Sequence, residues 1–268
     1  MSIHARPAAP VPQPPVRPDD KEFMATLAKG LAVLGAFGKD RPTLTLSEAA
    51  AATGISRATA RRILRTLAEL GYVEQSGRQF ALTANILRLG FAYLGSQSWI
   101  DRAQPLLREL AERSQESCSA AMLQGSEIVY VARVPARRIM SMALSVGSRL
   151  TAFHTALGRI QLGFLDEDEL WRRLKSLRLA PFTPYTITDL QAIIDRIRDD
   201  HAQGFSIVDE ELELGLRALA VPVVDRRQEL VAAINMSTHA SRTTRNEMRA
   251  HFLPELQRVA AQIALLLP

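Results

Sequence analysis

The order of apolar and polar positions divides the chain into three parts. Residues 1–18 hold six of the 14 prolines and little that could form a core, which predicts a disordered or polyproline-like tail over 1–20. Over residues 21–83, apolar side chains recur at helical spacing and then form two short β-like runs. Beyond a helix expected at 84–98, helical segments alternate with probable strands over 99–268, which indicates an α/β domain (α+β overall).

The order of elements in the first domain is helix, helix, tight turn, helix and hairpin. Thr45 and Glu48 have the spacing of a capping box, Gly54 breaks the second helix, and Ser56 caps the third. The expected elements are helices over residues 21–36, 46–53 and 57–70 and β-like runs over 72–75 and 79–82.

The segment 84–98 reads as a linker helix whose apolar residues are spread around it, so we expect it to pack on more than one side. In the domain that follows, expected strands cover residues 119–124, 128–134, 139–145, 205–208, 217–224 and 230–236. Expected helices cover 103–115, a segment from Thr155, one opened by Thr188 and Gln191 and ending at Gly204, and one capped by Thr244 and Glu247 and ending at Leu267, with a loop over 177–187.

The segment 47–70 has the features of a helix-turn-helix. Ala50, four residues before Gly54, allows the close helix crossing and left-handed turn of that motif. The helix after the turn carries an apolar arc opposite an arginine face that no acid interrupts. The apolar arc consists of Ala60, Ile63, Leu64, Leu67 and Leu70.

The arginine face is the candidate DNA-binding surface. A helix of about 15 residues rises ~22 Å, enough to lie in a major groove, where arginine pairs with guanine or phosphate. Small polar residues near its start, and an arginine in the hairpin turn, can contact base edges or the backbone. The candidate DNA contacts are Ser56, Arg57, Thr59, Arg61, Arg62, Arg65 and Arg78. The alternative is that the arginines merely solvate an ordinary helix.

The charge distribution agrees with a nucleic-acid partner. The net charge is +5, and residues 1–85 hold 11 of the 33 Lys and Arg but only 7 of the 28 Asp and Glu. The excess positive charge therefore lies in the first third, which favours an anionic partner. No apolar run reaches the ~18–20 residues that span a bilayer, and no secretory signal is present, so we expect a cytoplasmic protein without membrane contact.

The segment "LTLSEAAAATGISRATARRILRTLAELGYVEQSGRQFALT" resembles the winged-helix domain of the IclR family of bacterial transcription regulators. "VGSRLTAFHTALGRIQLGFL", "TPYTITD", "GFSIVDEELELGLRALAVPV" and "AAINMSTHASRTTRNEM" are similar to the family's effector domain, so the resemblance covers about residues 24–268. These segments are most similar to the branch that regulates protocatechuate, 4-hydroxybenzoate and β-ketoadipate catabolism.

The resemblance implies a winged helix-turn-helix, a linker helix and a GAF/profilin-like effector domain with a largely antiparallel sheet. It also implies a homodimer formed through the winged-helix and linker regions, and possibly a dimer of dimers. A dimer on a palindromic operator of double-stranded DNA also follows from the short reach of one recognition helix. The expected function is a ligand-responsive regulator of aromatic-acid catabolism, with a small aromatic or dicarboxylic acid as effector.

Thr155 can cap a helix whose first amides would bind an anion, and polar residues alternate along the last expected strand. An ordinary capped helix and ordinary strands would give the same spacing. The resemblance implies effector contacts at six positions: Ala156, Leu157, Leu216, Ala218, Asn235 and Ser237. We add as candidates the apolar Ile139 and Met142, the polar His154 and Asp209, and the cations Arg133 and Arg149. Ala218 and Asn235 depart from the family's usual cysteine and serine, which favours a larger acid than glyoxylate.

Enzyme chemistry has little support in the sequence. The acidic run Asp209, Glu210, Glu211 and Glu213 is expected to be a solvated turn, and Cys118 a buried small residue. The five histidines have no zinc-binding spacing, so neither a metal nor a cofactor is expected. Two rival hypotheses stay open at this point: an enzyme acting on a small organic acid with an accessory helix-turn-helix, and an adaptor that binds protein rather than DNA.

Overall fold

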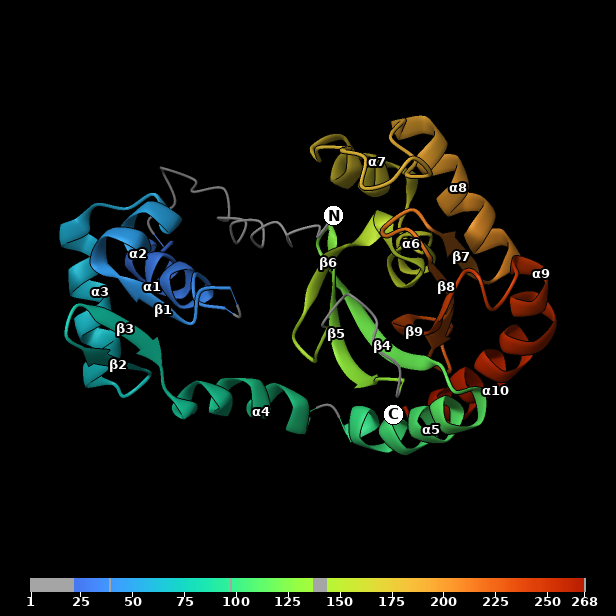
Figure 1. The fold of residues 1–268 in the computed structure, drawn as a ribbon, viewed down its shortest axis with the longest axis horizontal. Helices are drawn as coiled ribbons and strands as arrows, with labels where there is room; N and C mark the ends of the chain where they lie inside the picture. The colour runs from blue at the N-terminus through green and yellow to red at the C-terminus, as the bar shows by residue number, and fades with distance from the viewer. Residues whose placement is uncertain (1–21, 39, 97, 137–143, 268) are drawn as a thin grey trace. The chain divides into compact units, whose positions relative to one another are not determined.

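The computed structural model describes residues 22–38, 40–96, 98–136 and 144–267 (Figure 1). Its contacts divide the chain into two compact units between Tyr93 and Leu94. Among the described residues, no helix is both long and apolar enough to cross a membrane.

The first unit is a winged helix-turn-helix. Its helices are α1 (Ala25–Gly35), α2 (Leu46–Thr53) and α3 (Arg57–Glu69), and its strands are β1 (Thr43–Thr45), β2 (Val73–Ser76) and β3 (Gln79–Leu82). The strands form an antiparallel sheet in the order β1-β3-β2. The predicted helices and hairpin are confirmed, whereas β1 was not expected.

The turn between α2 and α3 is fixed by its caps. The Thr45 hydroxyl and the Glu48 carboxylate complete the predicted capping box at the start of α2. Gly54 ends α2 with φ 66°, the left-handed conformation that glycine adopts without steric cost. The Ser56 hydroxyl accepts the Thr59 amide at 3.2 Å and starts α3. Local sequence therefore sets the angle at which α3 leaves the turn.

The expected linker consists of a 3₁₀ turn (Ala84–Ile86) and α4 (Leu87–Ser96). No residue of α4 is buried, and Leu87, Leu89 and Phe91 are each more than half exposed. Within one chain, the expectation that this helix packs on more than one side is therefore wrong.

The second unit is built on one six-stranded antiparallel sheet, as the fold class predicted. Its strands are β4 (Ser117–Gln124), β5 (Glu127–Val134), β6 (Arg149–Thr151), β7 (Ser206–Asp209), β8 (Leu216–Val224) and β9 (Leu230–His239), in the order β6-β5-β4-β9-β8-β7. Its helices are α5 (Ser98–Ser114), α6 (Ala156–Leu162), α7 (Glu167–Lys175), α8 (Leu190–Gln203), α9 (Arg245–Glu247) and α10 (Leu253–Ala264).

The sheet lies between two layers of helix (Figure 1). One apolar core forms where α5 and α10 cover one face, and a second forms where α6, α7 and α8 cover the other. Small residues such as Ala120 and Ala233 let the helices lie close to the strands. The candidate effector site lies on the α6 face.

Three local expectations differ from the structure. The strand expected at 139–145 falls mostly outside the described residues, and the short edge strand β6 was not expected. The cap of α8 is Asp189, which accepts the Ala192 amide at 2.8 Å, rather than Thr188. The last helix begins at the predicted Thr244–Glu247 capping box but contains a π-helical turn (Met248–Phe252) before α10.

Candidate nucleic-acid interface and effector pocket

The arginine face of α3 is open to solvent. We name Arg57, Arg61, Arg62 and Arg65 the recognition face, and all four are exposed. The ion pair recorded for this face among the described residues joins Arg65 to Glu69 at 3.9 Å, and both side chains are at least two-thirds exposed. Such a pair contributes little in water, so the face keeps its positive charge.

The opposite face of α3 anchors the helix. Ala60, Ile63, Leu64 and Leu67 are buried against α1 and the small sheet. Leu70, which we expected on this apolar arc, is 59% exposed because α3 ends at Glu69. The buried arc therefore holds the recognition face outward along the whole helix.

The remaining predicted DNA contacts lie at the helix start and in the wing. The Ser56 and Thr59 hydroxyls are 2.9 Å apart at the start of α3. Arg78 is exposed in the turn between β2 and β3. The geometry thus supplies one basic helix and one basic wing, the two elements with which a winged helix contacts DNA. Their contact with DNA stays a prediction.

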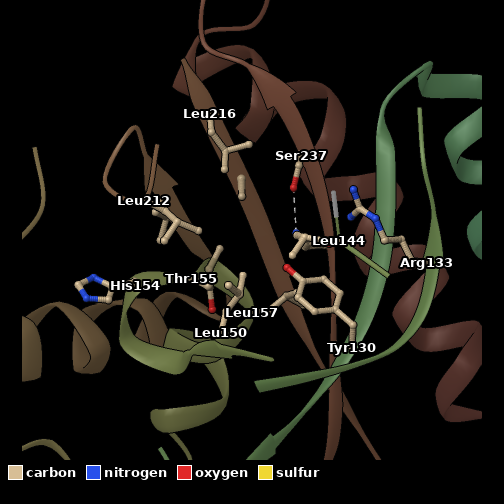
Figure 2. Close-up of a pocket in the computed structure, with 14 residues that line it drawn as sticks. Tyr130, Arg133, Leu144, Leu150, His154, Thr155, Leu157, Leu212, Leu216 and Ser237 are labelled. Atoms are coloured by element: carbon tan, nitrogen blue, oxygen red, sulfur yellow. Dashed lines mark hydrogen bonds between the residues drawn. The ribbon is translucent and has the colours of Figure 1, made fainter. Parts of the chain in front are cut away.

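The second unit contains a pocket between the sheet and the start of α6 (Figure 2). Its walls come from strands β5 to β9 on the sheet side, and from the first turn of α6, the turn before α6 and the β7–β8 turn on the other side. The lining residues are Tyr130, Arg133, Leu144, Leu150, His154, Thr155, Ala156, Leu157, Val208, Leu212, Leu216, Ala218, Asn235 and Ser237. Eight of the candidate effector contacts are in this set: Arg133, His154, Ala156, Leu157, Leu216, Ala218, Asn235 and Ser237.

A β-bulge brings two of the lining side chains together. Ala120 pairs with Ala132 and Ala121 with Tyr130, so β5 has one extra residue, Val131, at this point. Side chains alternate between sheet faces in a regular strand, and the bulge reverses the alternation. Tyr130 and Arg133 therefore both reach the pocket although they are three residues apart.

Arg133 is a cation without an ionic partner among the described residues. Its Nη1 donates to the Ser119 hydroxyl at 3.1 Å, and no described carboxylate lies within ion-pairing distance. A half-buried guanidinium lined on one side by leucines is a strong site for a carboxylate. Figure 2 shows Arg133 and Ser237 on one side of the pocket and His154 on the other, with leucine side chains between them.

Two buried polar atoms of the pocket residues have no hydrogen-bond partner in the described part of the chain: Asn235 Oδ1 and His154 Nδ1. The Asn235 amide nitrogen donates to the Ser237 hydroxyl at 3.0 Å, while its oxygen stays unpaired. An unpaired polar atom in a core costs free energy, and a ligand that pairs with it recovers that cost. Both atoms therefore favour a polar ligand in this pocket.

The start of α6 is packed tightly against the turn before it. Thr155 caps the helix by accepting the Gly158 amide at 2.9 Å. A Cβ atom at position 158 would lie 2.1 Å from the Ala152 carbonyl oxygen, so only glycine fits this approach. This contact places the first turn of α6, with Ala156 and Leu157, at the pocket wall.

His154 is neutral at physiological pH. Burial lowers its pKa from 6.5 to about 4, and the positive charge of Arg159 acts in the same direction. In the protein without ligand, His154 is therefore an uncharged hydrogen-bonding group.

The low pKa of His154 predicts a loss of stability in acid. Between pH 6.5 and 4 the unfolded chain binds the proton that the folded chain excludes, so stability falls as pH falls through this window. We expect the free energy of unfolding to fall by about 2 kcal/mol between pH 7 and pH 5 because of this group. Urea unfolding followed by tryptophan fluorescence measures it, since both tryptophans, Trp99 and Trp171, lie in the effector unit. A His154→Gln variant should lack this part of the pH dependence, and an unchanged dependence would contradict the assignment.

Three predicted effector contacts are not among the lining residues. Ile139 and Met142 lie outside the described residues. The Asp209 carboxylate accepts from Arg217 Nε at 2.7 Å, so its expected effector contact has no support from the geometry. The additional cation Arg149 is half-exposed and pairs with Glu127 at 2.9 Å, away from the lining set.

The acidic run after β7 is not a simple solvated turn. Glu211 is buried and forms a bidentate ion pair with Arg159, which is also buried, so the expectation for this residue is wrong. A signal for this pair is present in the sequence: Arg159 is the single charged residue in the apolar helix ALGRIQL. A charge inside an apolar segment needs a partner, and Glu211 supplies it from 52 residues away.

Cys118 is fully buried, and burial raises the pKa of its thiol to about 12, so it is not a reactive thiolate. Within the described ranges, no group of three or more His, Cys, Asp or Glu side chains could hold a metal ion.

Each of the two units matches a known protein family. Residues 26–77 match the model of the IclR helix-turn-helix domain, and residues 91–265 match that of the bacterial transcriptional regulator IclR C-terminal domain. The chain is 40% identical to the Pca regulon regulatory protein of Pseudomonas putida, over 94% of this chain and 90% of that protein. It is 35% identical to the p-hydroxybenzoate hydroxylase transcriptional activator of Acinetobacter baylyi, over 91% of this chain and 92% of that protein.

A solved structure of a ligand complex is also similar to the second unit. It is the inducer-binding domain of a double mutant of the PobR transcription factor from Acinetobacter, in complex with 3-hydroxybenzoic acid. The match has a TM-score of 0.59 at 28% identity and covers 62% of this chain and 98% of that domain.

Proposed function

Because the chain belongs to the IclR family of bacterial transcriptional regulators, we propose that it binds a palindromic operator through α3 and that a small aromatic or dicarboxylic acid in the α6-side pocket controls this binding. The chain is a transcription regulator rather than an enzyme, as its relatives are. A regulator of this kind acts on chromosomal DNA, which supports a cytoplasmic location.

The observation that carries the effector proposal is the Arg133 guanidinium in a largely apolar pocket, which has no carboxylate partner in the part of the chain that the structure describes. A carboxylate ligand would pair with this cation, and an aromatic ring would lie against the leucines and Tyr130. Ala218 on β8 lines the pocket with a small side chain, which leaves room for a ring where a larger side chain would fill the space. The complex of the PobR inducer-binding domain with 3-hydroxybenzoic acid adds support for an aromatic acid in this type of domain.

Calorimetric titration with a panel of acids tests the proposed effector class. The panel consists of protocatechuate, 4-hydroxybenzoate, the dicarboxylate β-ketoadipate and, as a control of small size, glyoxylate. We expect at least one of the first three acids to bind more tightly than glyoxylate, because a larger acid buries more apolar surface against the leucines of the pocket. Binding of glyoxylate alone would contradict the proposal.

The rival enzyme hypothesis is tested on the same samples. Incubation with each acid should return the acid unchanged, as chromatography of the mixture would show. Formation of a product that a Cys118→Ser variant fails to make would favour the enzyme hypothesis instead.

We also propose that the chain forms a dimer through the first unit and the linker. In α1, Leu27 and Leu31 are 58% and 57% exposed, and in α4, Phe91 is 65% exposed. Exposed large apolar side chains on neighbouring turns of a helix are typical of surfaces that another protein covers. A second copy of the chain is the partner that an operator with two half-sites requires.

Charged substitutions on these helices should separate the dimer. The Leu27→Glu and Phe91→Glu double variant should elute near the mass of a single 29.6 kDa chain, because burying two carboxylates in the interface is unfavourable. Leu265→Glu, at a 73% exposed position near the C-terminus, is the matched control and should leave the dimer intact. Light scattering after gel filtration gives the masses. A wild-type monomer, or a double variant that stays dimeric, would contradict this interface.

A further inference from the structure

One buried ion pair connects the segments that form the non-strand wall of the pocket. Arg159 in α6 is 1% exposed, and Glu211 in the β7–β8 turn is 8% exposed. Arg159 Nη1 and Nη2 lie 2.8 Å and 2.5 Å from the two carboxylate oxygens of Glu211. Arg159 Nε donates to the Phe153 carbonyl oxygen at 2.7 Å. One guanidinium thus fixes the positions of α6, the turn before α6 and the β7–β8 turn.

Each partner of Arg159 is next in sequence to a pocket-lining residue. Phe153 precedes His154, and Glu211 precedes Leu212, and both of these followers line the pocket. Arg159 and Glu211 are themselves absent from the lining residues. The pair therefore supports the segments that form the pocket wall, although neither of its residues lines the pocket.

The loop at residues 181–186 is hydrogen-bonded to the β7–β8 turn. The Thr183 hydroxyl donates to the Glu210 carbonyl oxygen at 2.7 Å, and the Thr186 hydroxyl donates to the Glu211 carbonyl oxygen at 2.6 Å. The ring of Phe182 meets that of His154 edge-on, with centroids 4.7 Å apart and an interplanar angle of 87°. This loop supports both His154 and the β7–β8 turn from the outer side.

The β7–β8 turn is a fixed structure. Glu210 has φ 59°, a conformation that residues other than glycine rarely adopt. Its carboxylate accepts the Gly215 amide at 2.8 Å, and its own amide donates to the Leu216 carbonyl oxygen at 2.8 Å. A conformation of this kind persists only where the surrounding contacts determine it. The position of Leu212 therefore depends on the contacts of Glu210 and Glu211.

We propose that Glu211, acting through Arg159, is a positioning residue for effector binding: the pair holds His154 and Leu212 at the distance from the sheet that the effector requires. This inference rests on the proposed function, in which the pocket binds a small aromatic or dicarboxylic acid. It differs from a purely stabilising role, because a stabilising pair would change the fold's stability without changing the pocket's affinity or local opening.

The same domain contains a matched control. Glu116 is 6% exposed and accepts from Arg242 Nη2 at 3.0 Å and 2.9 Å and from the Thr238 hydroxyl at 2.8 Å. This is also a buried carboxylate paired with an arginine, although Arg242 is 35% exposed, and it joins the start of β4 to the segment after β9. Its partner Thr238 follows the pocket residue Ser237, which is held in β9 by strand pairing on both sides.

The test compares Glu211→Gln and Glu116→Gln in the full chain. Both variants should unfold at a lower temperature than wild type. Only Glu211→Gln should weaken 4-hydroxybenzoate binding, by at least ~10-fold in calorimetric titration, because a misplaced wall weakens several ligand contacts at once. Only Glu211→Gln should speed amide hydrogen exchange selectively in segments 152–157, 181–186 and 210–216. An affinity within twofold of wild type, or an equal weakening in Glu116→Gln, would overturn the proposal.

A second variant removes a loop contact without burying an unpaired charge. Thr186→Val keeps the shape of the side chain and deletes the hydroxyl, which donates to the Glu211 carbonyl oxygen and accepts the amides of Phe182 and Thr183. It should lower the unfolding temperature less than Glu211→Gln does, weaken 4-hydroxybenzoate binding several-fold and speed exchange in 181–186 and 210–216. Unchanged affinity and exchange would count against the positioning role.

The two proposals fail in different ways. If the wild-type chain binds no acid of the panel, the proposed effector class is wrong, and the exchange comparison alone decides the role of the pair. Equal exchange of the three wall segments in Glu211→Gln and Glu116→Gln then overturns the positioning role.

Discussion

Replacing Arg57 and Arg61 by alanine should weaken operator binding by at least ~30-fold, since each arginine contact to a base or phosphate contributes about 1–3 kcal/mol. Both side chains are exposed on the recognition face and have no recorded ion pair among the described residues, so they are free to contact DNA. The apolar face of α3 is unchanged in this variant, and the domain should fold normally. Fluorescence anisotropy with DNA from the chain's own promoter region measures the effect.

The salt dependence of the same binding separates a specific surface from a general charge effect. The slope of log K against log salt should fall by about one for each phosphate interaction that the substitutions remove. The control is Arg226→Ala with Arg227→Ala, which removes two exposed arginines from the turn between β8 and β9 and changes the net charge equally. If the control weakens binding as much as the α3 variant does, the recognition face does not bind the DNA. If neither weakens it, the adaptor hypothesis gains support.

Replacing Arg133 by methionine should weaken effector binding by about 10- to 100-fold, the range expected for one hydrogen bond to a charged group. Methionine keeps most of the length of the side chain and removes its charge. The fold should tolerate the change, because the guanidinium contact given by the structure is a single hydrogen bond to the Ser119 hydroxyl. Calorimetric titration with the best acid of the panel gives the ratio of affinities.

Arg149→Met is the matched control for this prediction. Arg149 lies on the neighbouring strand, is half-exposed and pairs with Glu127 at 2.9 Å, so its removal should leave effector affinity nearly unchanged. A stronger effect in Arg149→Met than in Arg133→Met would show that Arg149, and not Arg133, pairs with the carboxylate of the effector. The methyl ester of the acid, which lacks the carboxylate charge, should bind both Arg133→Met and wild type weakly.

The helix-turn-helix could be predicted from sequence because local contacts determine it. The capping box at Thr45, the left-handed Gly54 and the cap at Ser56 each act within four residues. The opposing apolar and basic faces of α3 also lie within one helix. The three-residue strand β1 could not be predicted, because it exists only through its pairing with β3, where Thr45 lies opposite Gln79.

The pocket was only partly predictable because its walls depend on contacts between distant segments. Asn235 and Ser237 have the alternating spacing of one strand face, and the family resemblance identified them as effector contacts. Tyr130 was missed because a bulge reverses the side-chain alternation of β5, and the sequence has no turn residue there to indicate it. Glu211 was misread because its acidic neighbours suggested solvent, while its partner, Arg159, lies 52 residues away in α6.

An acid bound in the second unit should change the affinity of the first unit for DNA. The most direct measurement is the affinity of the chain for its promoter DNA with and without saturating protocatechuate, 4-hydroxybenzoate or β-ketoadipate. A regulator of this kind should show a change of about 5- to 150-fold, in either direction, with at least one acid, and Arg133→Met should reduce the change at the same acid concentration. Tight DNA binding that stays the same in the presence of an acid shown by calorimetry to saturate the pocket would contradict the account.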